Sequence, residues 1–194
     1  MDADTKNHIV EAIEQHKRMV EAIREDGVEI IAAVADAITT ALERDGTIYL
    51  CGNGGSAADA QHIAGELVGR FRRERKALAA VAFSTDTSVL TSIANDYAYE
   101  RVFARQAEAL VRENDLLWAF STSGTSANVI AAVEVAAERD ARVIAFTGAA
   151  DSELERIADI CLCADAESTA RSQEIHQLAY HIICDLVERS FANC

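Results

Sequence analysis

The sequence contains no proline and few positive charges: 18 lysine and arginine residues stand against 32 aspartate and glutamate residues. The absence of proline points to no particular function. The formal net charge of −14 argues against a nucleic-acid partner, because a phosphate backbone requires a basic protein surface. No apolar run reaches the ~18 residues that a membrane span needs, so we expect no membrane partner. The acidic start at residues 1–4 lacks the pattern of a secretory signal.

Cysteine is also scarce: there are five, an odd number that does not suit a disulfide framework. Cys51 and Cys161 stand in apolar runs typical of strands, which favours reduced thiols and a cytoplasmic protein. Hydrophobic residues make up 50% of the 194 residues, and no linker or low-complexity tract divides them. We therefore expect one domain with a full core over residues 1–194.

Two segments with helical periodicity, 5–25 and 27–45, precede the first predicted strand, and Gly27 separates them. Ile9 and Ile13 belong to an apolar stripe on the first segment. We expect a helical hairpin over residues 1–45, whose apolar faces need cover. A partner subunit would supply that cover, which assigns the hairpin to oligomerisation.

From residue 46 to the end, short apolar strands alternate with helical patterns. This alternation predicts a doubly wound parallel sheet, in which ligands bind beyond the carboxyl ends of the strands. The predicted strands are 47–51, 79–83, 116–120, 142–147 and 160–164. The predicted helices are 56–74, 86–94, 99–113, 126–139, 151–158 and 169–192.

Residues 121–126 read Ser-Thr-Ser-Gly-Thr-Ser and lie between a predicted strand and a predicted helix. Such a turn directs backbone N–H groups and the helix N-terminus toward one point, where an anion is stabilised. The loop has no lysine, unlike the P-loop of nucleotide-binding proteins. Hydroxyls and amides alone suit a sugar monophosphate, and the simpler alternative is an ordinary helix N-cap.

Residues 51–56 read Cys-Gly-Asn-Gly-Gly-Ser, directly after the first predicted strand. Glycines let backbone N–H groups approach a ligand closely. The spacing of Gly52, Gly54 and Ala57 also fits a dinucleotide fingerprint. That alternative fails, because no carboxylate follows at the end of a second strand to bind a ribose.

Acid–base residues stand on two of the predicted helices. His62 and Glu66 are four residues apart and share one helix face, which suits two ligands of one metal or a base beside an imidazole. Alone, such a pair is more often a solvated surface pair. The last helix carries His176 and His181, five residues apart, and the spacing does not choose between them.

Two polar features admit a structural and a functional interpretation. Asn95 and Asp96 fit helix caps as well as ligands for sugar hydroxyls. A basic cluster follows the helix that carries His62, and we expect it to be a solvated helix end rather than an anion site. The cluster consists of Arg70, Arg72, Arg73, Arg75 and Lys76.

These motifs together resemble the phosphoheptose isomerases, which are sugar-isomerase (SIS) domain proteins. The resemblance covers nearly the whole chain and rests on residues 51–56, 61–67, 94–97, 121–129 and 171–181. It implies a Rossmann-like α/β/α sandwich with a five-stranded parallel sheet. It also implies a homotetramer whose active sites are shared between subunits, with one zinc ion per subunit.

The resemblance also implies roles for individual residues. His62, Glu66, Gln173 and His181 match the metal ligands of the family, and Glu66 and His181 match its general base and general acid. The positions that match substrate contacts include Glu66 and Gln173 again. The others are Asn53, Gly54, Gly55, Ser56, Asn95, Asp96, Ser121, Thr122, Ser123 and Ser126.

The implied reaction converts D-sedoheptulose 7-phosphate into D-glycero-D-manno-heptose 7-phosphate through an enediol, the first step of heptose biosynthesis for surface glycans. The rivals are an isomerase of another phosphosugar and a non-catalytic SIS protein that binds the bacterial replication initiator. The second rival lacks the catalytic pair, so Glu66 and His181 favour the enzyme. Thr125 and Ser172 depart from the usual family residues, at positions without a chemical role.

Overall fold

The computed structural model describes residues 2–192 and contains a five-stranded, all-parallel sheet in the order β2-β1-β3-β4-β5. Every predicted strand is present, so the predicted fold class is confirmed. The strands are β1 (Ile48–Gly52), β2 (Ala80–Ala82), β3 (Leu116–Ser121), β4 (Arg142–Thr147) and β5 (Ile160–Cys163). β1 and β3 are buried along their whole length, as their unbroken apolar sequences require.

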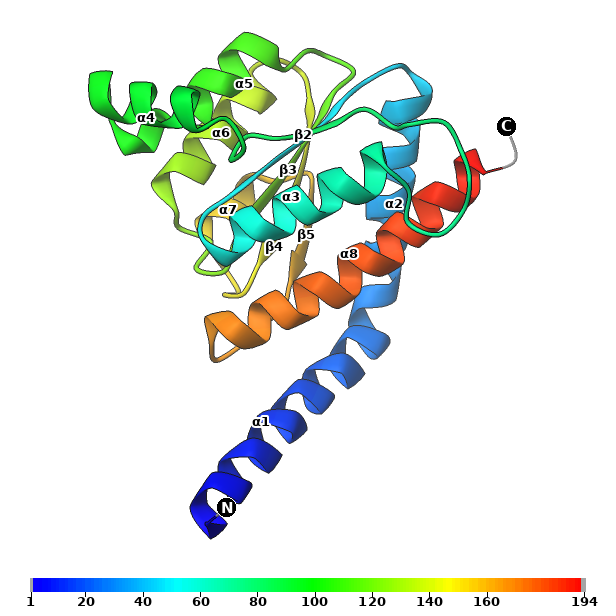
Figure 1. Ribbon diagram of the computed structural model, residues 1–194, viewed down its shortest axis with the longest axis vertical. Helices are drawn as coiled ribbons and strands as arrows, with labels where there is room; N and C mark the ends of the chain where they lie inside the picture. The colour runs from blue at the N-terminus through cyan, green and yellow to red at the C-terminus, as the bar shows by residue number, and fades with distance from the viewer. Residues whose placement is uncertain (1, 193–194) are drawn as a thin grey trace.

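Helices cover both faces of the sheet (Figure 1). Alternate strand residues point to opposite faces, so Trp118 and Phe120 belong to one core and Leu117 and Ala119 to the other. The first core includes α2 (Val28–Glu43), α3 (Gly55–Val68) and α8 (Thr169–Phe191). The second includes α5 (Ala104–Leu110), α6 (Ala127–Ala137) and α7 (Glu153–Ile157). The helix predicted at 99–113 is divided into a 3-10 turn, η2 (Tyr99–Arg101), and α5, and α4 (Thr87–Asp96) precedes both.

The predicted N-terminal hairpin is wrong. α1 (Ala3–Ala22) continues through a π-helical segment, η1 (Ile23–Gly27), directly into α2, and Figure 1 shows α1 projecting away from the sheet. A glycine that ends a helix usually adopts a left-handed conformation, whereas Gly27 keeps φ −93° and ψ −14°. Gly27 therefore carries the helix onward.

The two parts of this long helix differ in burial. α2 buries its apolar face, including Val34 and Ile38, in the first core beside α8. α1 buries no residue, and Ile9, Val10 and Ile13 are 46%, 50% and 59% exposed. The part of the apolar stripe that carries Ile9 and Ile13 is thus uncovered in a single chain, whereas Met19 and Val20 pack against the first core. None of the described helices combines the length and apolar character required to cross a membrane.

The basic cluster is not a solvated helix end, because α3 stops at Val68 and the cluster lies in the loop beyond it. Glu188 on α8 accepts hydrogen bonds from the backbone N–H groups of Phe71, Arg72 and Arg73, each 2.8 Å long. Burial opposes ionisation of Glu188, but these hydrogen bonds lower its pKa. The Arg75 side chain is buried beside it, so the cluster anchors a loop to α8.

Candidate active site

The two loops that the sequence singles out lie next to each other. β1 and β3 are hydrogen-bonded neighbours, with Gly52 paired to Phe120, so their carboxyl ends coincide. Residues 52–56 follow β1 and residues 121–126 follow β3. This edge of the sheet is where a doubly wound fold binds its ligand.

Residues 121–126, here called the hydroxyl loop, form a compact network. Ser121 Oγ lies 3.3 Å from Ser123 Oγ and 2.9 Å from Ser126 Oγ, and Thr125 N–H donates to Ser123 Oγ over 3.3 Å. Gly124 adopts φ +64°, which a residue with a side chain rarely tolerates. Ser126 is the N-cap of α6, but its side chain makes no capping hydrogen bond. The ordinary N-cap interpretation therefore does not account for this hydroxyl.

The glycine loop after β1 is fixed by side-chain amides. Asn53 and Asn128 exchange two hydrogen bonds of 2.8 Å, and the Tyr99 hydroxyl donates to Asn53 Oδ1 over 2.9 Å. A Cβ atom on Gly55 would lie 2.3 Å from Gln173 Nε2. Glycine at position 55 thus admits the Gln173 amide beside the start of α3.

His62, Glu66 and His181, here called the imidazole cluster, bring α3 and α8 together. His62 Nε2 lies 3.2 Å from Glu66 Oε1 and 3.4 Å from His181 Nε2. Burial, and then the neighbouring His62, lower the pKa of His181. The side chains of His62 and Glu66 are 39% and 22% exposed, so the cluster is open to solvent.

Two residues that the sequence argument missed support His62 from behind. The Tyr180 hydroxyl lies 3.1 Å from His62 Nδ1 and donates to Asp59 Oδ1 over 3.3 Å. Burial raises the pKa of Asp59, and burial together with Asp59 raises the pKa of Tyr180. The position of Asp59, three residues before His62 on the same helix face, was the signal available in the sequence.

His176 occupies a different place from His181. It is fully buried against Phe120 and Phe146, and its Nε2 lies 3.0 Å from the Thr147 carbonyl oxygen. Burial lowers the pKa of His176 to about 4, against a smaller effect of the Thr147 hydrogen bond. Of the two histidines that spacing left open, the structure places His181 in the imidazole cluster and His176 in the core.

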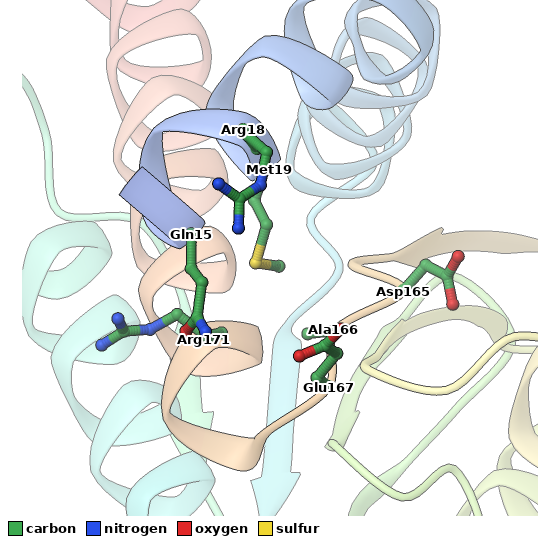
Figure 2. Close-up of a pocket in the computed structure, with 7 residues that line it drawn as sticks. All are labelled: Gln15, Arg18, Met19, Asp165, Ala166, Glu167 and Arg171. Atoms are coloured by element: carbon green, nitrogen blue, oxygen red, sulfur yellow. The ribbon is translucent and has the colours of Figure 1, made fainter. Parts of the chain in front are cut away.

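The predicted positions Asn95 and Asp96 lie at the end of α4. Asn95 Nδ2 donates to Asp96 Oδ1 over 2.8 Å at the end of α4, and both residues are exposed. Asp96 is the last residue of α4 rather than the cap of a following helix. Figure 2 shows a pocket of about 150 Å³ between α1 and the segment leading into α8, and none of its lining residues is a predicted site residue.

Two pairs of donor atoms in the imidazole cluster have a spacing that is compatible with zinc. At the Zn–N and Zn–O bond lengths of 2.0–2.2 Å, two tetrahedral ligand atoms lie about 3.3 Å apart. The two distances from His62 Nε2, 3.2 Å and 3.4 Å, agree with this spacing. No group of three or more His, Cys, Asp or Glu side chains within residues 2–192 is arranged to hold a metal ion.

The side chain of Gln173, the fourth predicted ligand, lies at the start of α3. Its amide packs on Gly55, which precedes His62 by seven residues, or about 10 Å along α3. One chain therefore presents two pairs of donor atoms at a spacing compatible with zinc, and the Gln173 amide lies beside Gly55.

Comparison with known proteins places this chain in a class. Residues 13–148 match the SIS domain family. The phosphoheptose isomerase of Roseiflexus sp. (strain RS-1) is 53% identical over 161 residues, which cover 83% of this chain and 82% of the relative. The phosphoheptose isomerase of Thiobacillus denitrificans is 56% identical over 157 residues, 79% of this chain and 80% of the relative.

Solved structures agree with the sequence comparison. The phosphoheptose isomerase of Neisseria gonorrhoeae superposes with a TM-score of 0.90 at 41% identity, covering 95% of this chain and 99% of that one. The fold is that of the SIS-domain proteins. Within that class, the chain belongs to the phosphoheptose isomerase family.

Proposed function

We propose that this chain is an aldose–ketose isomerase that converts D-sedoheptulose 7-phosphate into D-glycero-D-manno-heptose 7-phosphate. The observation that carries the proposal is the Glu66 carboxylate beside two imidazoles in a fold whose strand-end loop is lined with hydroxyls. A carboxylate and an imidazole supply a base and an acid, and the hydroxyl loop supplies neutral donors for a phosphate. The product would serve the synthesis of surface glycans.

In the proposed mechanism, Glu66 removes a proton from C1 of the open-chain ketose and returns it to C2. The C1–H electron pair forms the enediol double bond, and the C2 carbonyl oxygen gains a proton. His181 acts as the acid and base at the sugar oxygens. Each correctly placed acid or base contributes about 10²–10⁴-fold to the rate.

The phosphate is assigned to the hydroxyl loop, through Ser121, Thr122, Ser123 and Ser126. Binding energy gained at the phosphate, remote from the reacting carbons, holds the open-chain sugar in line for proton transfer. Asn53, Gly54, Gly55 and Ser56, with Gln173, border the same strand-end region and are assigned to the sugar. Asn95 and Asp96 are assigned to its hydroxyls on the resemblance alone.

The proposed cofactor is zinc, held by His62, Glu66 and His181 and completed by Gln173. Bound there, zinc would act as a Lewis acid on the C1 and C2 oxygens of the sugar. A carboxylate that binds a metal is a poorer base, so either Glu66 would leave the ion during turnover or the ion would mainly organise the site.

We also propose that the enzyme is a homotetramer with shared active sites, in the cytoplasm. Two features support the assembly: the uncovered stripe of α1, and the separation of Gln173 from the imidazole cluster. Cys51, Cys161, Cys163 and Cys184 are free thiols, which suits a reducing compartment. A mixing experiment tests the shared site: His62→Ala and Gln173→Ala proteins, each inactive, should regain part of the activity after their subunits are exchanged.

The proposal is tested by incubating the purified protein with sedoheptulose 7-phosphate and following a new heptose phosphate by NMR. Turnover that falls with a chelator and returns with zinc would support both the reaction and the metal. If the folded protein leaves this substrate unchanged in every condition, the isomerisation of another phosphosugar or a non-catalytic binding role takes its place. A panel of aldose and ketose phosphates then separates those two outcomes.

A further inference from the structure

We infer that Asn128 is a positioning residue that, with help from Tyr99, fixes the side chain of Asn53 between the hydroxyl loop and the glycine loop, residues 52–56. Asn128 lies on α6 and Tyr99 in η2. The inference rests on the proposed function, in which the hydroxyl loop binds the phosphate of the substrate and Asn53 contacts its sugar. Asn128 and Tyr99 then act on the sugar through Asn53.

The first step of the argument is the place of the two asparagines. Asn53 directly follows β1, and Asn128 is the second residue of α6, which begins where the hydroxyl loop ends. β1 and β3 are neighbours in the sheet, with Gly52 paired to Phe120. The contact between the two asparagine side chains therefore joins the two loops, although 75 residues separate them in the chain.

The second step is the form of this contact. Asn53 Nδ2 donates to Asn128 Oδ1, and Asn128 Nδ2 donates to Asn53 Oδ1, both over 2.8 Å. Two hydrogen bonds between the same pair of planar amides fix their separation and their relative orientation, which one bond would not do. The pair offers the same two bonds when both amides are turned over, so the contact holds in either orientation. Asn128 is only 3% exposed, so little water competes for it.

The third step is that the helix does not account for Asn128. Asparagine is favoured at helix starts because its side chain can accept a hydrogen bond from the unpaired backbone N–H groups there. Ser126 occupies the cap position of α6, and Asn128 lies in the first turn. Within residues 2–192, the hydrogen bonds of the Asn128 side chain go to Asn53 and to no backbone group of α6. The contacts of Asn128 thus serve the connection between the loops.

Tyr99 adds a contact from a third segment. Its hydroxyl donates to Asn53 Oδ1 over 2.9 Å. Tyr99 is 57% exposed, so water could serve this hydroxyl, and the hydrogen bond is not needed to satisfy a buried group. Its effect is to hold Asn53 from η2 as well as from α6. Asn53 is therefore fixed before a sugar binds, and a misplacement of about 1 Å at such a group can cost about 10²-fold in rate.

The first experiment needs no ligand. Exchange of the Asn53 side-chain amide protons with water, followed by NMR, should be slowed in the wild-type protein by the bond to Asn128. It should become faster in Asn128→Ala and, to a smaller extent, in Tyr99→Phe. Two matched controls should leave the exchange unchanged: Glu134→Ala, at an exposed position of α6, and Tyr97→Phe, at a residue that is 62% exposed.

The second experiment separates the sugar from the phosphate. Asn128→Ala should lower kcat/KM for sedoheptulose 7-phosphate by about 10²-fold. Inhibition by inorganic phosphate should stay as in the wild type, because the hydroxyl loop and the backbone of α6 are intact. In an Asn53→Ala background, Asn128→Ala should cause little further loss, because its effect passes through Asn53. Tyr99→Phe should act in the same direction as Asn128→Ala but less strongly.

The outcomes distinguish this inference from the proposed function. If Asn53 is protected from exchange as expected but sedoheptulose 7-phosphate is left unchanged, the positioning of Asn53 is supported and the proposed reaction fails. Unprotected amide protons on Asn53 in the wild-type protein would overturn the inference, whatever the activity. Equal weakening of phosphate inhibition and of kcat/KM in Asn128→Ala would overturn it too, because Asn128 would then act on the hydroxyl loop. Additive losses in the double variant would have the same meaning.

Discussion

The hydroxyl loop and the imidazole cluster are built in opposite ways. The hydroxyl loop follows a fully buried strand, and its serine side chains hydrogen-bond to one another, with Ser121 only 4% exposed. The imidazole cluster lies on two helices, and its His62 side chain is 39% exposed. The difference shows that the sheet fixes the hydroxyl loop within a single chain. The imidazole cluster, by contrast, is accessible to solvent in a single chain.

α8 connects the two parts. His176 lies on this helix, and its Nε2 atom is 3.0 Å from the carbonyl oxygen of Thr147. Thr147 is paired with Ser121 in the sheet, so His176 supports the first residue of the hydroxyl loop. His181 lies five residues further on, in the imidazole cluster. Histidine thus has a structural role beside the hydroxyl loop and a proposed chemical role in the imidazole cluster.

The largest expected effect comes from the imidazole cluster. Glu66→Gln keeps the size of the side chain and the fold but removes the proposed base, so kcat should fall by about 10²–10⁴-fold. Glu74→Gln, a change at a surface carboxylate that is 88% exposed, is the matched control. Steady-state assays of both variants test the assignment, and substantial turnover in Glu66→Gln would remove Glu66 from the mechanism.

The next effect concerns His176 and the stability of the fold. The pKa of His176 is about 4 in the fold, against an ordinary value of 6.5. Between these two pH values the unfolded chain takes up a proton that the folded chain refuses. The free energy of unfolding should therefore decrease by about 3 kcal/mol as the pH falls from above 6.5 to 4.

Urea unfolding at several pH values measures this loss. His176→Gln, which keeps an N–H donor but does not titrate, should flatten the pH dependence in that window. His8→Gln, at an exposed position of α1, should leave the dependence as in wild type. An unchanged slope in His176→Gln would show that His176 is protonated as readily in the folded as in the unfolded chain.

A smaller effect is expected from the hydroxyls. Ser123→Ala should raise KM about 10–100-fold and change kcat less, because a hydrogen bond to a charged group is worth about 1.5–3 kcal/mol. Thr125→Ala, in the same loop, controls for disturbance of the loop itself. Steady-state kinetics with sedoheptulose 7-phosphate measure the effect, and an unaltered KM would show that the phosphate does not bind at the Ser123 hydroxyl.

The smallest effect on the chain's own stability should come from α1. Val10→Glu with Ile13→Glu alters residues that are 50% and 59% exposed, so the free energy of unfolding of a single chain should change by no more than about 0.5 kcal/mol. The same change should dissociate the proposed assembly, which sedimentation would detect, whereas Lys17→Ala should leave it intact. An unchanged assembly in the double variant would show that this stripe is not the interface.

Much of this comparison could be read from the sequence, but unequally. Unbroken apolar runs predict the strands, and the hydroxyl-rich turn after Phe120 predicts the loop, because both depend on residues adjacent in the chain. The helical hairpin was mispredicted because Gly27 permits a turn without requiring one. The choice of His181 over His176 and the contact of Tyr180 with Asp59 depend on how α3 and α8 pack, which local spacing does not fix.

The most direct test of the central claim, that Glu66 moves a proton between C1 and C2, is solvent exchange. Sedoheptulose 7-phosphate is incubated with the enzyme in deuterium oxide, and deuterium at C1 of the recovered ketose and C2 of the aldose is measured by NMR. The account predicts incorporation at both carbons with wild-type enzyme and with Glu74→Gln, and almost none with Glu66→Gln. Exchange at the wild-type rate in Glu66→Gln would contradict it.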